Sequence, residues 1–291
     1  MRVLVTGASG FLGHNFCRLH ASRFELVTAW GRRPPVVPGA ASHQVDLADG
    51  AALGRLLEAA RPDAILHLGA MTRVEECERN PRAWAVNHEA SRRIALFAAA
   101  RGLRLVHVST DLVFDGTSAP YREEDRPAPV SDYGRTKAAA EEAVLAAGGN
   151  AVVCRISLAF GRAPDGALRQ IDWILRDAAA GKPVKLFTDE WRTPIDAATA
   201  ADCLAELIEL DLRGILHVAG TERWSRFDFG RFLLARAGLD PGLAVPGTIR
   251  ESPLPRPPDV SLDTVRARRV LATPFLGVEA GLARVLSGAV E

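Results

Sequence analysis

The sequence has no long apolar run. Its longest apolar stretches are far too short to span a bilayer, so we expect no membrane-spanning helix. It also has no excess of charge: the formal net charge is +1, and no overall field favours nucleic acid or an anionic membrane as a partner. The first expected strand begins at Arg2, which leaves no room for a signal peptide. With 48% hydrophobic residues and no internal repeat, the chain is expected to form a globular core.

Cysteine is scarce and scattered. The four cysteines form no C-x-x-C pair, and their spacing argues against disulfide bridges and against zinc: they are Cys17, Cys77, Cys154 and Cys203. We therefore expect buried thiols in a reducing compartment, and a cytoplasmic protein. No metal site is expected, because His67 has no second histidine or carboxylate at metal spacing and is better explained as a core or strand-end residue.

A glycine-rich turn follows the first expected strand. Residues 2–6 form a short β-rich apolar run, and the glycines Gly7, Gly10 and Gly13 come next, before a helical pattern that reaches about residue 20. Glycines here let the backbone turn tightly and approach a pyrophosphate, and the helix N-terminus attracts phosphates. The strand and helix on either side make this spacing typical of a dinucleotide site. We predict an α/β fold with a doubly wound parallel Rossmann sheet.

The end of the second expected strand bears on the choice of cofactor. Residues 25–30 form that strand, and Arg32 and Arg33 follow where an NAD-selective protein usually has an acid. Guanidinium groups suit a 2′-phosphate, so the sequence favours NADP, with NAD still possible; a solvated pair of loop charges is the alternative. Asp46 is expected either to bond the adenine amino group or to cap the helix that begins near residue 49.

Two further segments lie between this site and the middle of the chain. Residues 63–68 are expected to be a strand that ends beside the cofactor, near Gly69. Asn87, on an otherwise apolar helix face, is expected either to make a buried hydrogen bond, such as steadying Lys137 through water, or to face solvent. The proline-rich residues 33–38 read as a loop, and the charged, proline-rich residues 117–129 as a lid over the substrate.

The stretch 106–137 carries the expected chemistry. Thr110 lies just past the apolar strand 103–108, and Tyr133 and Lys137 are four apart on a helix that begins after Ser131 or Asp132, so they share a face. A phenol has a pKa of about 10 and is a poor acid or base at neutral pH. A neighbouring cation lowers that pKa, and a shift to about 7 requires roughly 4 kcal/mol, which we expect Lys137 and the positive charge of a nicotinamide to supply together. Thr110 and Tyr133 are then expected to hold a carbonyl oxygen between them.

Five motifs together resemble the extended short-chain dehydrogenase/reductase family, and within it the dTDP-4-dehydrorhamnose reductase branch. They run in the family's order over nearly the whole chain: T-G-A-S-G-F-L-G at 6–13, S-T-D-L-V-F-D-G at 109–116, Y-G-R-T-K at 133–137, R-I-S-L-A-F-G at 155–161 and R-P-P-D-V-S-L-D at 256–263.

The resemblance implies a function and a role for several residues. It implies an NADP(H)-dependent reductase of a nucleotide-linked 4-keto sugar, in which Tyr133 delivers the proton, Lys137 bonds the nicotinamide ribose, and Thr110 orients the carbonyl. The positions that match the family's cofactor contacts are Gly7, Gly10, Phe11, Leu12, Gly13, Asp46, Leu47, Leu68, Gly69 and Ala70.

Two departures from the branch leave other functions open. Leu112 stands where tyrosine is typical, and Leu158 where a tryptophan packs near the sugar. The leucine at position 158 equally resembles the sequence of the methionine adenosyltransferase β subunit. That protein is an NADP-binding regulatory subunit, so a non-catalytic role is the first alternative. A nucleotide-sugar epimerase is the second. A dehydratase normally has extra acids beside the catalytic threonine, and Asp111 alone supplies one.

The C-terminal third is expected to complete the substrate site. We assign 1–160 and roughly 193–220 to the Rossmann domain, and 161–192 with 221–291 to a smaller, discontinuous substrate lobe. Helices are expected at 168–181, 197–210, 225–238 and 277–286, and short strands at 185–187 and 215–219. Trp191, Arg192 and Arg256, with Thr110 and Asp111, are the candidates for binding a nucleotide diphosphate sugar; ordinary packing or ion pairing is the alternative for each. A homodimer is possible.

Overall fold

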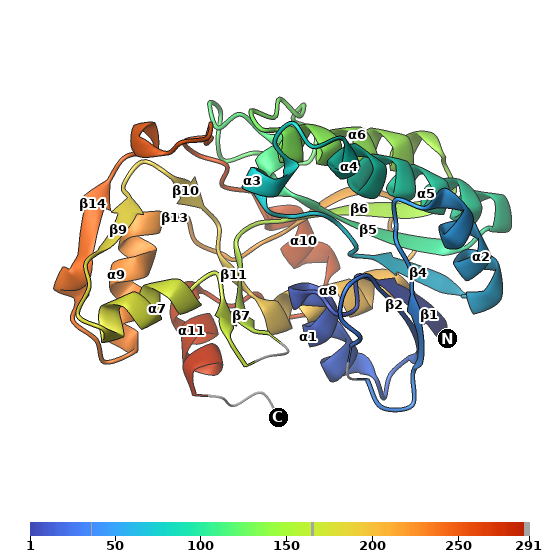
Figure 1. Ribbon diagram of the computed structural model, residues 1–291, viewed down its shortest axis with the longest axis horizontal. Helices are drawn as coiled ribbons and strands as arrows, with labels where there is room; N and C mark the ends of the chain where they lie inside the picture. Colours follow the sequence, from blue (N-terminus) through green and yellow to red (C-terminus); the bar gives the residue numbers. More distant parts are fainter. Residues whose placement is uncertain (36, 164–165, 288–291) are drawn as a thin grey trace.

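A parallel seven-stranded sheet forms the centre of the molecule (Figure 1). In this computed structural model, which describes residues 1–35, 37–163 and 166–287, the strand order is β12-β6-β5-β4-β1-β2-β3. The bounds are β1 Arg2–Thr6, β2 Glu25–Trp30, β3 Ala41–Gln44, β4 Ala64–His67, β5 Arg104–Thr110, β6 Asn150–Ile156 and β12 Gly214–Val218. The order runs outward from β1 in both directions, so the predicted doubly wound sheet is confirmed. Residue 36 of the expected 33–38 loop lies outside the described residues.

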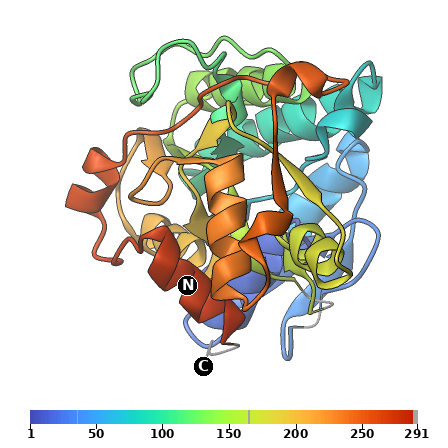
Figure 2. The same cartoon turned by 90° about the vertical axis from the view of Figure 1, so that its left-hand side faces the viewer.

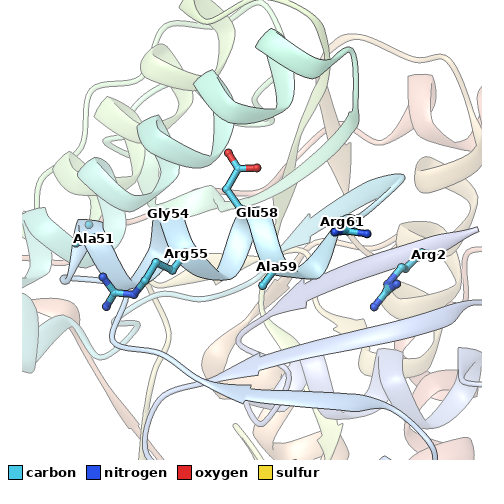
Figure 3. A pocket seen from close by; sticks show the side chains of 8 residues that line it. Arg2, Ala51, Gly54, Arg55, Glu58, Ala59 and Arg61 are labelled. Atoms are coloured by element: carbon cyan, nitrogen blue, oxygen red, sulfur yellow. The ribbon is translucent and has the colours of Figure 1, made fainter.

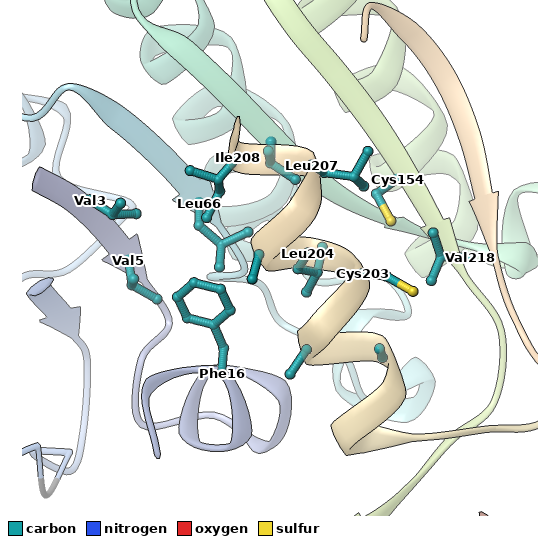
Figure 4. Close-up of a cluster of buried hydrophobic side chains, with 14 of the residues drawn as sticks. Val3, Val5, Phe16, Leu66, Cys154, Cys203, Leu204, Leu207, Ile208 and Val218 are labelled. Atoms are coloured by element: carbon teal, nitrogen blue, oxygen red, sulfur yellow. The ribbon is translucent and has the colours of Figure 1, made fainter. Parts of the chain in front are cut away.

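Helices cover both faces of this sheet. One face carries α2 (Gly50–Ala60), α5 (Ala90–Arg101) and α6 (Asp132–Ala146), and the other carries α1 (Phe11–His20), α8 (Ala197–Glu209) and α10 (Val265–Val270). Figure 4 shows the second layer, where Phe16 of α1 and Leu204 of α8 pack on Val5 and Leu66 of the sheet. Burying each such side chain contributes roughly 1.5–3 kcal/mol, which fixes both helices on the strands.

Side-chain caps determine where several helices begin. Asp49 accepts hydrogen bonds from the backbone of Ala51 and Ala52 at the start of α2. Asp46 is therefore not the cap, and that alternative is wrong. Ser131 caps α6 by accepting from Gly134 N at 3.1 Å. The helix expected at 168–181 begins late: β8 (Leu168–Arg169) comes first, and Gln170 has φ +70°, a left-handed conformation that interrupts a helix before α7 (Asp172–Ala179).

A smaller lobe lies beyond the carboxyl ends of the sheet strands, and Figure 2 views it face on. In it α7, α9 (Arg226–Arg236) and α11 (Val278–Leu286) share a buried cluster with the parallel pair β9 (Val184–Phe187) and β14 (Ala244–Gly247). Two small sheets connect lobe and core. One pairs β10 (Trp191–Arg192) with β13 (Trp224–Ser225), and the other joins β11 (Ile195–Asp196), β7 (Ala159–Arg162) and β8.

The 117–129 segment is held at several points, of which Tyr121 makes the most contacts. The Tyr121 hydroxyl donates to Asp115 and accepts from the backbone of Gly116 and Thr117. The backbone of Tyr121 bonds Ser261 and Asp263, residues of the C-terminal third. This expected lid is therefore anchored to the C-terminal third of the chain and, through Glu123, which accepts from His217 N at 3.1 Å, to β12. Across the described residues, no helix combines the length and the apolar character that a membrane crossing requires.

Three strands of the sheet carry completely buried polar rings. His67 of β4, His107 of β5 and His217 of β12 have at most 1% of their surface exposed. Burial is the largest cause that lowers the pKa of each: to about 3 for His67 and His217, and well below the usual value for His107. All three are therefore neutral at physiological pH. The four cysteines are also buried and unpaired, as expected.

From these buried histidines we predict that acid lowers the free energy of unfolding already at pH values above those at which carboxylates titrate. Below pH 6.5 the unfolded chain binds protons at these positions and the folded chain does not, so the free energy of unfolding falls by roughly 1.4 kcal/mol per pH unit for each histidine. Urea unfolding at intervals between pH 6.5 and 4.5 measures the slope. His217→Leu should reduce that slope by one histidine's share. An unchanged slope in this variant would contradict the assignment.

Candidate active site

The glycine turn brings the ends of two sheet strands into contact. Gly7 follows β1 with φ +70°, a conformation that favours glycine. A Cβ there would lie 2.7 Å from Gly69 N, just past the end of the adjacent β4. Gly10 then precedes the first turn of α1, whose N-terminus points its free backbone N–H groups toward this edge. The two backbones approach so closely here that a side chain on Gly7 has no room, and a glycine turn of this kind before a helix forms a cradle that suits the backbone contacts of a pyrophosphate.

The remaining expected cofactor residues line the same edge. Phe11, Leu12 and Gly13 lie in the first turn of α1, and Leu68, Gly69 and Ala70 follow β4, with Leu47 against Gly69. Arg32 and Arg33 follow β2 and are exposed. Asp46 is exposed after β3, and both of its carboxylate oxygens accept from Arg82 at 2.8 Å. A carboxylate in that ion pair is charged, and hydrogen bonding to Arg82 holds its pKa below the usual range.

Asn87 makes a buried bridge, and it does so from an unusual helix. It lies in a π-helical turn (Trp84–Glu89) between the short α4 (Pro81–Ala83) and α5. Its amide accepts from Met71 N at 2.8 Å and donates to Met71 O and to Thr136 Oγ1, both at 3.0 Å. Asn87 therefore joins the loop after β4 to the residue next to Lys137. The buried alternative is correct, but its described partners are Met71 and Thr136.

Thr110, Tyr133 and Lys137 come together at the carboxyl end of β5. Thr110 is the last residue of β5, and its hydroxyl accepts from Leu112 N at 3.2 Å in a 3₁₀ turn (Asp111–Val113). Tyr133 and Lys137 lie in the first turns of α6, which presses directly on that turn. A Cβ on Gly134 would lie 2.3 Å from Leu112 O, so only glycine permits this approach. The Thr110 hydroxyl donates to Asp111 Oδ1 at 3.2 Å and is close enough to the Tyr133 phenol to lower its pKa.

In the protein without ligands Lys137 does not lower the pKa of Tyr133, and its lowering by Lys137 and a nicotinamide together stays a prediction. Burial raises the pKa of Tyr133, and the Asp111 charge adds to this, while the Thr110 hydrogen bond and the Arg192 charge oppose it. The Lys137 ammonium donates to Val108 O at 2.7 Å on β5. Burial lowers the pKa of Lys137 to about 8, against the opposing charge of Glu141. The phenol is thus protonated, in the form that can donate a proton.

A buried ion pair connects this site to the lobe. Arg192 of β10 donates twice to Asp111, from Nε to Oδ2 at 2.7 Å and from Nη2 to Oδ1 at 2.5 Å. Ser157 also donates to Asp111 Oδ2, at 2.6 Å, and then accepts from Thr193 N. Asp111 is completely buried and Arg192 is 8% exposed. The Arg192 guanidinium is therefore committed to Asp111, within range of the Tyr133 phenol whose pKa it lowers.

Further guanidinium groups gather around Glu190, which is buried beside Arg192. Arg256 Nη1 lies 3.5 Å from Glu190, and Arg192 Nη1 lies 3.7 Å from it. Arg226, whose backbone N–H bonds Glu190 O, has a buried Nη1 with no partner among the described residues. The Trp191 ring already has a stacking partner, because the Arg223 guanidinium covers one of its faces at 3.7 Å from the ring centroid.

One surface pocket is separate from this site. It has a volume of about 760 Å³ and lies on the outer side of α2, with Arg2, Arg55, Glu58 and Arg61 among its lining residues (Figure 3). Arg2 begins β1, whereas the glycine turn follows the end of that strand. The pocket therefore runs along α2 from Gly50 to Arg61, and its lining includes none of the residues expected at the cofactor or catalytic sites.

A dinucleotide cradle next to a threonine, a tyrosine and a lysine on a doubly wound sheet defines a class of protein. It is the arrangement of the short-chain dehydrogenase/reductases, with the added lobe of the extended members. The chain belongs to the family described as the RmlD substrate binding domain, which it matches over residues 1–290.

The relatives of this chain fall into two groups, reductases and a regulatory subunit. The chain is 35% identical over 245 residues to a probable low-salt glycan biosynthesis reductase of Haloferax volcanii, covering 82% of this chain and 81% of that protein. It is 33% identical over 283 residues to the dTDP-4-dehydrorhamnose reductase of Mycolicibacterium smegmatis, covering 94% and 81%. It is also 32% identical over 300 residues to methionine adenosyltransferase 2 subunit beta of Bos taurus, covering 97% and 87%.

Solved structures share the whole fold. A hypothetical dTDP-4-dehydrorhamnose reductase from Sulfolobus tokodaii is 34% identical, with a TM-score of 0.85 over 96% of this chain and 98% of that one. A dTDP-4-dehydrorhamnose reductase from Bacillus anthracis in complex with NADP has a TM-score of 0.87 over 99% of both chains. Its 23% identity shows the fold alone.

Some residues of this site were not expected from the sequence. Glu190 and Arg226 carry no motif, and no local spacing pairs Arg192 with Asp111, which are 81 positions apart. Gly134 did carry a signal: a glycine inside a helix of good formers costs about 1 kcal/mol relative to alanine, which indicates a close backbone contact.

The Asp111–Arg192 pair predicts a large cost of mutation. Asp111→Ala leaves a buried guanidinium without its main partner and should lower the free energy of unfolding by about 3–5 kcal/mol in urea titrations. The matched control is Glu209→Ala, which breaks the exposed pair with Arg23 and should cost less than about 1 kcal/mol. Equal, small losses in the two variants would show that the buried pair does not stabilise the fold.

Proposed function

We propose that this protein is an NADP(H)-dependent reductase of a nucleotide-linked 4-keto sugar, like the dTDP-4-dehydrorhamnose reductases of its family. The observation that carries the proposal is the assembly of Thr110, Tyr133 and Lys137 at the edge where the glycine turn lies. Thr110 ends β5, and Tyr133 and Lys137 lie on α6. The backbone contact between Gly134 and Leu112 holds these two elements together, and a tyrosine and a lysine exposed on the surface of a helix would not require such a contact.

The geometry supports reduction, with Tyr133 as proton donor. When bound, the nicotinamide cofactor would supply hydride to the carbonyl carbon. Thr110 and Tyr133 would hold the carbonyl oxygen, and the phenol, protonated because it is buried, would pass its proton to that oxygen. The resulting phenolate would lie near two cations, Arg192 and Lys137, which stabilise its charge until it is reprotonated.

The lobe would bind the nucleotide diphosphate. Arg192 is occupied by Asp111, so we assign the diphosphate to Arg256, whose side chain is 37% exposed, and to Arg226, whose Nη1 lacks a partner among the described residues. A guanidinium group can bind phosphate through two parallel hydrogen bonds. In this assignment Arg192 acts as the fixed cation between the phosphates and the reacting carbonyl. The cofactor would then bind to the Rossmann core and the nucleotide diphosphate to the substrate lobe, in keeping with the expected domain division.

A regulatory subunit is the second candidate, because the chain covers 87% of methionine adenosyltransferase 2 subunit beta. Leu158 and Leu112, where the reductase branch has aromatic rings, are buried and half-buried at the site. A protein that only holds a dinucleotide has no need of Tyr133 as a donor, so the two candidates differ in turnover. A cytoplasmic location and a homodimer stay predictions.

The first test is NADPH oxidation with dTDP-4-keto-6-deoxyglucose, with a UDP-linked keto sugar as control. Tyr133→Phe should reduce turnover by a factor on the order of 10²–10⁴ because the proton donor is lost. Cofactor affinity, measured by fluorescence titration, should stay nearly unchanged. Near-wild-type turnover in this variant would remove Tyr133 from the mechanism, and no turnover of any keto sugar in the wild type would favour the regulatory candidate.

The second test concerns cofactor choice. Arg32→Ala removes a guanidinium placed for the 2′-phosphate and should weaken NADPH binding by roughly 10-fold or more, with little effect on NADH. Arg55→Ala, on the outer side of α2, is the matched control and should change neither affinity. If Arg32→Ala weakens both cofactors equally, the loop after β2 does not select between them.

A further inference from the structure

A buried histidine touches Lys137 from the strand below. His107 of β5 has no exposed surface, and its Nε2 lies 3.3 Å from Lys137 Nζ. The same ammonium donates to the carbonyl of Val108, the next residue along β5, at 2.7 Å. Since the ammonium has three hydrogens and no acceptor capacity, these two contacts take two of them.

The contact determines the tautomer of His107. An ammonium can only donate, so Nε2 must accept and the ring proton must be on Nδ1. That Nδ1 is buried and has no partner among the described residues. A buried donor without a partner costs about 1–3 kcal/mol, and such exceptions in a core usually have a functional explanation.

The neighbouring His67 has the opposite tautomer for a different reason. Ser91 donates to Asn87 O at 2.6 Å, so His67 Nε2 must donate to Ser91 Oγ at 3.0 Å. His67 Nδ1 then accepts from Thr6 Oγ1 at 2.6 Å. All polar atoms of this ring have partners, and they hold the end of β1 against the end of β4. The two rings lie side by side, 5.2 Å apart, yet only His107 reaches the lysine.

We propose that His107 is the positioning residue of Lys137: together with the Val108 carbonyl it binds two of the three ammonium hydrogens and leaves one for the cofactor ribose or Tyr133. The geometry of the pair stands by itself, whereas the catalytic use of Lys137 rests on the proposed function. The proton remains on Lys137, because burial and the lysine charge itself hold the pKa of His107 well below its usual value.

The other titratable groups near Lys137 are accounted for. Glu141, one turn further along α6, raises the pKa of Lys137, but its carboxylate is bound by Arg155 at 2.8 Å. His67 on β4 is neutral. Tyr133 on the same helix is protonated. An acceptor removed at position 107 is therefore not replaced by another group, and the charged form of Lys137 loses a hydrogen bond.

The test reads Lys137 directly. The chain contains only three lysines, Lys137, Lys182 and Lys185, so lysine labelled with ¹³C at Cε gives resolved signals whose pH titration reports each pKa. Without cofactor, Lys137 should titrate near 8 in the wild type. His107→Phe should lower that value by about one pH unit or more, because it removes an acceptor from a charged donor. His107→Gln, which keeps an acceptor near the Nε2 position, should restore it.

Controls separate a positioning role from simple packing. His217→Leu removes an equally buried imidazole from β12 and should leave the Lys137 titration unchanged. If keto-sugar reduction is observed, the alkaline limb of its kcat/KM profile should move to lower pH in His107→Phe by the same amount and return in His107→Gln. If the wild type reduces no keto sugar, the proposed function fails, and the titrations still decide the inference.

Two results would overturn the inference. One is a Lys137 pKa in folded His107→Phe equal to that of the wild type, or a His107→Gln value equal to that of His107→Phe. The other needs no variant and applies even if His107→Phe does not fold. Imidazole ¹⁵N spectra of the wild type should show His107 protonated at Nδ1 and His67 at Nε2, and a proton on His107 Nε2 would rule out acceptance from the lysine.

Discussion

The bidentate contact between Asp111 and Arg192 joins the two parts of the molecule at the point where the chemistry is expected. Asp111 belongs to the turn after β5, and Arg192 to a two-residue strand of the lobe. Their charges act on the Tyr133 phenol in opposite directions, the carboxylate raising its pKa and the guanidinium lowering it. The pair thus fixes the lobe on the core and brings both charges to the phenol, while burial is the largest cause that raises the pKa of Tyr133 and keeps it protonated.

Local patterns predicted the elements that depend on local physics. The strand, glycine turn and helix at the N-terminus follow from residues within 20 positions, and Ser131 and the 133–137 spacing identify the start of α6 and its active face. Thr110, Tyr133 and Lys137 could be placed together because two consecutive elements carry them. The local pattern did not predict the start of α7, because Gln170 before it adopts a left-handed conformation that a helical pattern does not reveal.

Properties that depend on the environment could not be predicted in the same way. The pKa of Tyr133 was expected to fall because Lys137 is four residues away, but sequence spacing contains no information about burial, which is the largest cause and acts in the opposite direction. Arg192 looked available for phosphate because its partner is 81 positions away. Asn87 was expected to act near Lys137, and the contact with Thr136 places it one residue from it, although a π-helical turn was needed to aim the amide inward.

Leu112 is one of the positions where this chain departs from the reductase branch. Its contact with Gly134 constrains the backbone there but not the side chain. The carbonyl of Leu112 is pressed against α6 and its N–H is bound to Thr110, so the main chain there cannot move without displacing the threonine and the tyrosine. Its side chain carries neither constraint and packs, partly buried, between the cluster that contains Tyr133 and the cluster that contains Phe114 and Tyr121. Evolution, or an engineer, can therefore exchange residue 112 to suit a different sugar while the reacting groups keep their alignment.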